Sequence, residues 1–113
     1  MDSLTRASVM GYFEMVNSLL DGMWKKAEKG DGGAVRKYLK DVVKYMEKVP
    51  PRAAAVSTEH MKLREACSQT ADLIDICQQE RRDPSDREVK RHFGAIRKAQ
   101  TKWLESLEAL VSP

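Results

Sequence analysis

Histidine and cysteine, the side chains most often used as metal ligands and nucleophiles, are scarce in this chain: there are two of each among 113 residues. No Cys-x-x-Cys or His-x-x-x-His spacing occurs, so the common zinc patterns are missing. The nearest match to a di-iron motif is Glu88 with His92, which has a different spacing and no second copy. The loop Gly30–Gly33 contains neither the lysine of a phosphate-binding loop nor the spaced acidic ligands of a calcium loop. We therefore expect no metal, no other cofactor and no enzymatic activity.

The two cysteines, Cys67 and Cys77, are ten positions apart. On one helix this spacing separates them by about 15 Å along the axis. A disulfide requires Cα atoms within about 7 Å of each other, so they cannot pair within the chain. Both fall on the apolar face of their predicted helix, where we expect them to be buried and to act as small hydrophobic side chains.

Long hydrophobic runs are also missing, since no apolar stretch approaches the roughly 20 residues of a membrane span. Residues 1–6 lack the basic-then-apolar arrangement of a signal peptide. Prolines number only four and glycines six, while 42% of the residues are apolar and 33% are charged, as in globular helical proteins. We expect a soluble, cytoplasmic protein that forms one domain over residues 1–113, because this length suffices for an independent core.

Three short breaks divide the chain into four segments with helical periodicity. The breaks are residues 30–33, the double proline Pro50-Pro51, and residues 83–85. The predicted helices extend over about 3–29, 34–49, 55–82 and 86–111. Ser85 and Glu88 have the spacing of a capping box, which marks the start of the last helix. Four amphipathic segments with short connections predict an all-α, antiparallel up-down four-helix bundle.

Each predicted helix has an apolar seam of residues spaced alternately by four and three positions. Two polar residues, Thr70 and Gln100, occupy seam positions at equivalent depth in the third and fourth helices. Because an unpaired buried amide costs about 1–3 kcal/mol, we expect these side chains to share a polar layer that sets the register. The complete seams are Val9, Phe13, Val16, Leu20, Met23 and Ala27; Val35, Leu39, Val42, Met46 and Val49; Val56, His60, Leu63, Cys67, Thr70, Ile74 and Cys77; and Val89, Phe93, Ile96, Gln100, Trp103, Leu107 and Leu110.

The first helix has an apolar arc that spans roughly 220° of the helical wheel. Met10, Met15 and Leu19 lie at its margins, where we predict that they are exposed. Methionine suits adaptable binding surfaces because its side chain is flexible and polarizable. So wide an arc indicates a helix that is deeply buried in the bundle or that contacts a partner, including a second copy of the chain in a homodimer.

The second helix has a basic face, with like charges at i,i+4 spacing. Six basic residues stand against two acids, Asp41 and Glu47, between positions 36 and 52. This face is interpreted as a solvated surface, as a site for an acidic protein or an anionic membrane surface, or as a site for nucleic acid. Tyr38 and Tyr45 lie nearer the seam than a stacking platform for bases would. The basic residues are Arg36, Lys37, Lys40, Lys44, Lys48 and Arg52.

His60 occupies a seam position, where we expect a core or boundary histidine with its hydrogen bonds satisfied. Histidine phosphotransfer bundles place a lysine and a glycine just after the phosphorylated histidine. That pattern is missing here, because His60 is followed by Met61, Lys62, Leu63 and Arg64.

Arg87 and His92 have an Arg-x4-His spacing, which resembles the catalytic signature of the HEPN ribonucleases. Those enzymes are helical bundles of similar length whose active site forms by dimerisation, so the resemblance implies a ribonuclease that uses these two residues. That family commonly has a polar residue such as asparagine after the arginine, whereas this chain has Glu88. A solvated first turn on a charged helix accounts for the same residues.

The order of helix lengths and the double-proline turn are similar to the rapamycin-binding bundle of the TOR kinases, a resemblance that implies topology alone. The sequence as a whole predicts a non-enzymatic helical-bundle module that binds another protein, as an adaptor or scaffold does. The predicted surfaces are the margin of the first helix, the basic face of the second, or both. Binding of nucleic acid or anionic lipid through the basic face is the alternative, and the HEPN-like ribonuclease is a further one.

Overall fold

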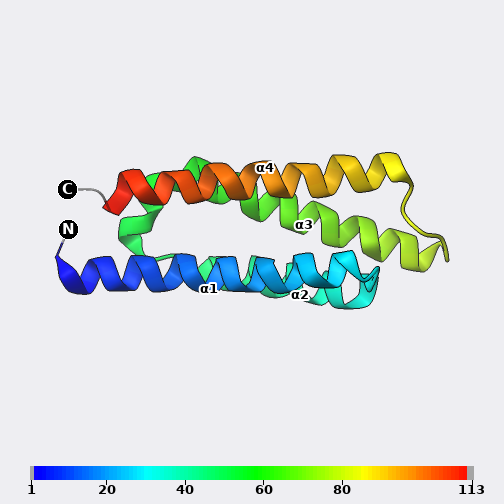
Figure 1. Ribbon diagram of the computed structural model, residues 1–113, viewed down its shortest axis with the longest axis horizontal. Coiled ribbons are helices and arrows are strands. Elements are labelled where there is room, and N and C mark those ends of the chain that lie inside the picture. Colours follow the sequence, from blue (N-terminus) through cyan, green and yellow to red (C-terminus); the bar gives the residue numbers. More distant parts are fainter. Residues whose placement is uncertain (1, 112–113) are drawn as a thin grey trace.

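The computed structural model describes residues 2–111, apart from the side chains of residues 54–56. In this range four α-helices pack as an antiparallel up-down bundle that measures 51 × 20 × 20 Å (Figure 1). They are α1 (Ser3–Glu28), α2 (Gly32–Tyr45), α3 (Ser57–Gln79) and α4 (Asp86–Val111). The predicted all-α four-helix bundle is confirmed. No helix of this range is both long and apolar enough to cross a lipid bilayer.

The end of α1 follows from the glycine at the first break. Gly30 has a φ of +69°, a left-handed conformation that glycine adopts without steric cost. Asp31 N–H donates to the Lys26 carbonyl at 3.1 Å and Gly30 N–H to the Ala27 carbonyl at 3.0 Å, which is the Schellman arrangement of a helix C-terminus. Asp31 then caps α2 by accepting from Ala34 N–H at 3.1 Å. For this reason α2 begins at Gly32, slightly before the predicted start.

The second helix is shorter than predicted. α2 ends at Tyr45, and Met46–Lys48 form the 3₁₀ helix η1, so the α-helix does not reach Val49. A second 3₁₀ helix, η2 (Pro51–Val56), precedes α3, which begins later than predicted. Proline lacks an N–H and disfavours the α conformation in the residue before it. The double proline therefore replaces regular α-helix with 3₁₀ turns on both of its sides.

The third helix ends at Gln79, earlier than the predicted position 82, because Arg81 adopts a left-handed conformation with a φ of +52°. Arg82 N–H donates to the Cys77 carbonyl at 2.9 Å, as in the Schellman arrangement after α1, although the left-handed residue is not glycine. The predicted capping box follows. Glu88 N–H donates to Ser85 Oγ at 3.1 Å, and Ser85 N–H donates to the Glu88 carboxylate at 2.9 Å. α4 has the predicted bounds.

The Arg82 side chain joins the two sides of this turn. Its guanidinium donates to the Glu80 carboxylate at 2.6 Å and to the Glu88 carboxylate at 2.8 Å. The bond from Arg82, assisted by that from Ser85 N–H, lowers the pKa of Glu88 to about 2. Glu88 is the last acid before the basic part of α4, and its charge is thus paired with Arg82 within the turn.

The core is made mainly of the predicted seams, joined by Tyr12, Ala53, Ala71 and Leu73, and one seam residue of α4 is exposed. Val89 is 37% exposed, because the turn between α3 and α4 projects beyond the end of α1 and α2 (Figure 1). Cys67 and Cys77 are free and buried as predicted, and burial raises the pKa of Cys67 to about 12. The side chain of Val56, also predicted for a seam, lies outside the described residues. The buried seam residues are Val9, Phe13, Val16, Leu20, Met23, Val35, Leu39, Val42, Met46, His60, Leu63, Cys67, Thr70, Ile74, Cys77, Ile96 and Trp103.

The polar layer has different members from those predicted. The Gln100 amide accepts from Trp24 Nε1 at 2.9 Å and donates to Asn17 Oδ1 at 2.8 Å, both on α1. Thr70 donates to the Ala66 carbonyl of its own helix at 2.8 Å. Thr70 and Gln100 do not hydrogen-bond to each other, because a helical threonine can satisfy its hydroxyl locally, whereas the amide finds its donor and acceptor on a neighbouring helix.

Two neighbouring helices, α2 and α4, pack against the wide apolar arc of α1. On one side α2 approaches closely, and the Tyr38 ring lies against Gly22, where an added Cβ would come within 2.7 Å of the ring. On the other side α1 and α4 approach each other less closely, and large side chains fill the space between them. Trp103 stacks on Phe13 with ring centroids 4.0 Å apart, and Trp24 reaches α4 at the rim. α4 is thereby held to α1 by a few large contacts, while it packs along α3 over more of its length.

Candidate functional site

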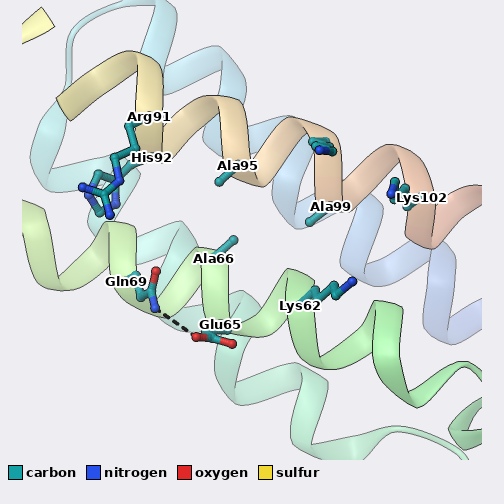
Figure 2. A pocket seen from close by; sticks show the side chains of 10 residues that line it. Lys62, Glu65, Ala66, Gln69, Arg91, His92, Ala95, Ala99 and Lys102 are labelled. Carbon is teal, nitrogen blue, oxygen red and sulfur yellow. Dashed lines mark hydrogen bonds between the residues drawn. The ribbon is translucent and has the colours of Figure 1, made fainter. Parts of the chain in front are cut away.

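A groove of about 370 Å³ lies between α3 and α4 on the outside of the bundle (Figure 2). Its lining residues recur at spacings of three and four along each helix, so they share one face of α3 and one face of α4. Those faces adjoin the buried seams at an angle and meet where the two helices pack. The lining comprises Lys62, Glu65, Ala66 and Gln69 of α3, and Arg91, His92, Ala95, Lys98, Ala99 and Lys102 of α4.

The floor of the groove is made of small side chains. Ala66 and Ala95 face each other from the two helices, and Ala99 lies one turn further along α4 (Figure 2). Ala66 and Ala99 are half-buried and pack against the core, while Ala95 is exposed. Alanine at these positions keeps the space between the helices open, because no longer side chain extends across it.

Four cations surround this floor. Arg91 lies at one end beside His92, and Lys62 and Lys102 lie at the other end, one on each helix (Figure 2). Among the described residues, none of Lys62, Arg91, Lys98 and Lys102 forms an ion pair with a carboxylate. Like charges at i,i+4, such as Lys98 and Lys102, repel each other by a few tenths of a kcal/mol. An anion bound here would relieve that repulsion.

The single carboxylate in the lining is on the α3 side. Glu65 accepts a hydrogen bond from Gln69 Nε2 at 3.0 Å, and both side chains are exposed (Figure 2). The α4 side of the groove is therefore uniformly basic, whereas the α3 side has one cation at one end and one acid near its middle. This asymmetry defines which charges a ligand can place on each side.

The predicted basic face of α2 is divided by the fold. Arg36 and Lys40 both pair with Asp75 of α3, and the hydrogen bond from Arg36 lowers the pKa of Asp75. Lys48 lies over the Tyr45 ring, 5.7 Å from its centroid. The remaining members, Lys37, Lys44 and Arg52, are exposed and have no ion pair within the part of the chain that the structure describes. Two of the six predicted cations thus pair with a carboxylate and a third contacts an aromatic ring.

The predicted apolar margin of α1 is only partly open. Met15 is 47% exposed, whereas Met10 and Leu19 are half-buried, and Leu19 packs against the core. The three side chains therefore do not form one exposed apolar surface.

Arg87 and His92 are not brought together in the fold. Five positions on a helix correspond to a rotation of about 140°, so the two side chains lie on different faces of α4. Arg87 is exposed in the first turn, while His92 is half-buried and lines the groove. Among the described residues, no three His, Cys, Asp or Glu side chains are grouped closely enough to hold a metal ion.

The groove was not predicted, although the charge pattern of α4 contains a signal for it. Residues 89–104 include five basic residues and no acid, a longer uninterrupted basic stretch than that of α2. Sequence periodicity shows which residues share a face, but it does not show that this face of α4 meets the alanine side of α3. The basic residues of this stretch are Lys90, Arg91, Arg97, Lys98 and Lys102.

His60 belongs to a separate, buried polar cluster that includes a residue from the N-terminal half of α1 and one just after the C-terminus of α2. Its Nε2 lies 2.7 Å from the Tyr12 hydroxyl, which also lies 3.4 Å from the Met46 carbonyl. Burial lowers the pKa of His60, the Met46 carbonyl opposes this shift as a hydrogen-bond acceptor, and the nearby charge of Arg64 adds to it. His60 is thus the satisfied core histidine that the sequence predicted.

This lowered pKa leads us to expect that the fold loses stability as the pH falls below about 6.5. The unfolded chain takes up a proton on His60 near that pH, whereas the folded chain does so only at a lower pH. The unfolded state then binds more protons, so the free energy of unfolding decreases with falling pH by at most about 1.4 kcal/mol per pH unit. Urea unfolding between pH 7.5 and 5.5 should show this slope, and His60→Gln should flatten it. His92→Gln is the control and should keep the slope of the unmodified protein; equal slopes in all three proteins would contradict the assignment.

Comparison of the chain with models of protein families, with curated proteins and with solved structures finds no match in any of the three.

Proposed function

We propose that this chain is a non-catalytic binding module that holds an acidic segment of another protein in the groove between α3 and α4. The observation that supports this most is the set of four cations without carboxylate partners, arranged around a concave, alanine-lined floor. Unpaired cations on a surface attract anionic partners and increase the rate of encounter with them. The formal net charge of +3 acts in the same direction.

The shape of the site favours a protein segment over nucleic acid or a membrane. Proteins that bind single strands stack bases on aromatic side chains, and no Phe, Tyr or Trp is among the described residues that line the groove. A membrane surface is flat and would meet a convex charged face better than a groove. The exposed lysines of α2, Lys37 and Lys44, lie seven residues apart on one helix face outside the groove, so they are the comparison site for binding of nucleic acid or a membrane.

The proposal is tested with three fluorescent probes at about 150 mM salt, where screening already limits loose charge pairing to about 8 Å. The probes are an unstructured 20-residue peptide of Glu, Asp, Gly and Ser, a 20-base-pair DNA duplex, and vesicles containing phosphatidylserine. We expect saturable one-to-one binding of the peptide, with the duplex and the vesicles bound at least tenfold more weakly. Equal or tighter binding of the duplex or the vesicles, or no binding of the peptide, would overturn the proposal.

A further inference from the structure

The length of the basic side of the groove corresponds to a helical ligand. From Arg91 to Lys102 the rise along α4 is about 16 Å, which is three turns of α-helix. The cations at the two ends of this distance, with Lys98 between them, repeat at spacings of seven and four residues. A helix laid beside α4 presents its own side chains at the same spacings, so each of the three cations can face a carboxylate at the matching position.

The floor of the groove provides a seat for such a helix. Helix axes can approach to about 8 Å only where the side chains between them are small. Ala66, Ala95 and Ala99 supply small side chains from both helices, whereas the space between α1 and α4 is filled by Trp24 and Trp103. An added helix would rest on the alanines and keep its acidic residues beside the rims.

We infer that the acidic segment binds as an amphipathic helix of about three turns that lies along the groove as a fifth helix, an inference that depends on the proposed function above. Its narrow apolar face contacts Ala66, Ala95 and Ala99. One flank carries carboxylates at intervals of seven and four residues toward Arg91, Lys98 and Lys102. The other flank is acidic only at the end near Lys62, because Glu65 would repel a carboxylate placed further along.

Two synthetic peptides of identical composition distinguish helix recognition from charge attraction. The patterned peptide places alanine and leucine on one face and glutamate on the flanks described above, and the scrambled peptide has the same residues without that pattern. We expect the unmodified protein to bind the patterned peptide at least tenfold more tightly than the scrambled one by fluorescence anisotropy. Circular dichroism should show added helix in the mixture with the patterned peptide.

A substitution in the floor tests the seat without changing any charge. Ala95 is exposed, so Ala95→Leu should leave the fold intact while filling the middle of the groove. We expect this substitution to lower the affinity for the patterned peptide at least tenfold and to change the affinity for the scrambled peptide by no more than twofold. Ala7→Leu makes the same chemical change on the exposed face of α1 and should alter neither affinity.

Equal binding of the two peptides to the unmodified protein, or no effect of Ala95→Leu on the patterned peptide, would overturn the helical mode while leaving the proposed function in place. If neither peptide binds the unmodified protein, the proposed function itself fails together with the inference.

Discussion

Replacing Trp103 with alanine should lower the free energy of unfolding by about 3–5 kcal/mol, the usual cost of truncating a large buried aromatic side chain. Trp103 is fully buried, stacks on Phe13 at 4.0 Å and meets the edge of Tyr12 with centroids 6.3 Å apart. It is one of only two fully buried residues on α4 within the described range, the other being Ile96. Because α1 and α4 contact each other mainly through a few large side chains, a loss of this size is a large part of the 5–15 kcal/mol that stabilises a typical domain.

Urea unfolding at pH 7.5, followed by circular dichroism, measures this effect, and Trp24→Ala is the matched control. Trp24 is half-buried at the rim of the same interface, so its replacement should cost clearly less, about 1–2 kcal/mol. The two variants remove the same side chain from the same helix pair, but they differ in burial, and Trp24→Ala also removes the hydrogen bond to Gln100. A cost below 1 kcal/mol for Trp103→Ala, or equal costs for both, would contradict the described packing of α4 on α1.

The fold could be predicted from the sequence because each helix encodes its own buried face. The seams of α1 and α2 are determined by apolar residues at alternating spacings of four and three, and the capping box at Ser85 determines where α4 begins. The predicted helix ends were wrong where the local backbone conformation differs from what side-chain periodicity indicates. Arg81 adopts a left-handed conformation that arginine seldom takes, and the 3₁₀ turns beside Pro50 do not alter the apolar pattern.

The site could not be predicted in the same way, because it depends on which exposed faces meet. Periodicity assigned the cations of α2 to one face but did not show that Asp75 of α3 would neutralise two of them. In the same way, it did not place Lys62 of α3 opposite the uninterrupted basic stretch of α4. Pairwise contacts between helices determine how many surface charges remain unpaired, and those contacts follow from register and rotation that the apolar pattern leaves open.

Reversing two cations of the groove should weaken binding of the acidic peptide by about 10- to 100-fold. Each exposed pair of opposite charges contributes about 0.2–1 kcal/mol, and a reversal replaces that attraction with a repulsion of similar size. Two reversals then amount to about 0.8–4 kcal/mol. The middle of this range, about 1.4–2.8 kcal/mol, corresponds to the expected factors of 10 to 100. Lys98→Glu with Lys102→Glu is the suitable pair, because both residues are exposed and have no partner among the described residues. The free energy of unfolding of this double variant should differ from that of the unmodified protein by no more than about 0.5 kcal/mol.

The most direct test of the groove as the binding site compares this pair with Lys37→Glu and Lys44→Glu on α2. Each Lys→Glu change removes two units of charge, so both double variants lower the formal net charge from +3 to −1 and differ only in where the charge is reversed. The affinity for the patterned acidic peptide is measured by fluorescence anisotropy at about 150 mM salt for the unmodified protein and both variants. The structure predicts a loss of tenfold or more for the groove variant and of less than threefold for the α2 variant. Equal losses, or a larger loss for the α2 variant, would contradict the assignment of binding to the groove between α3 and α4.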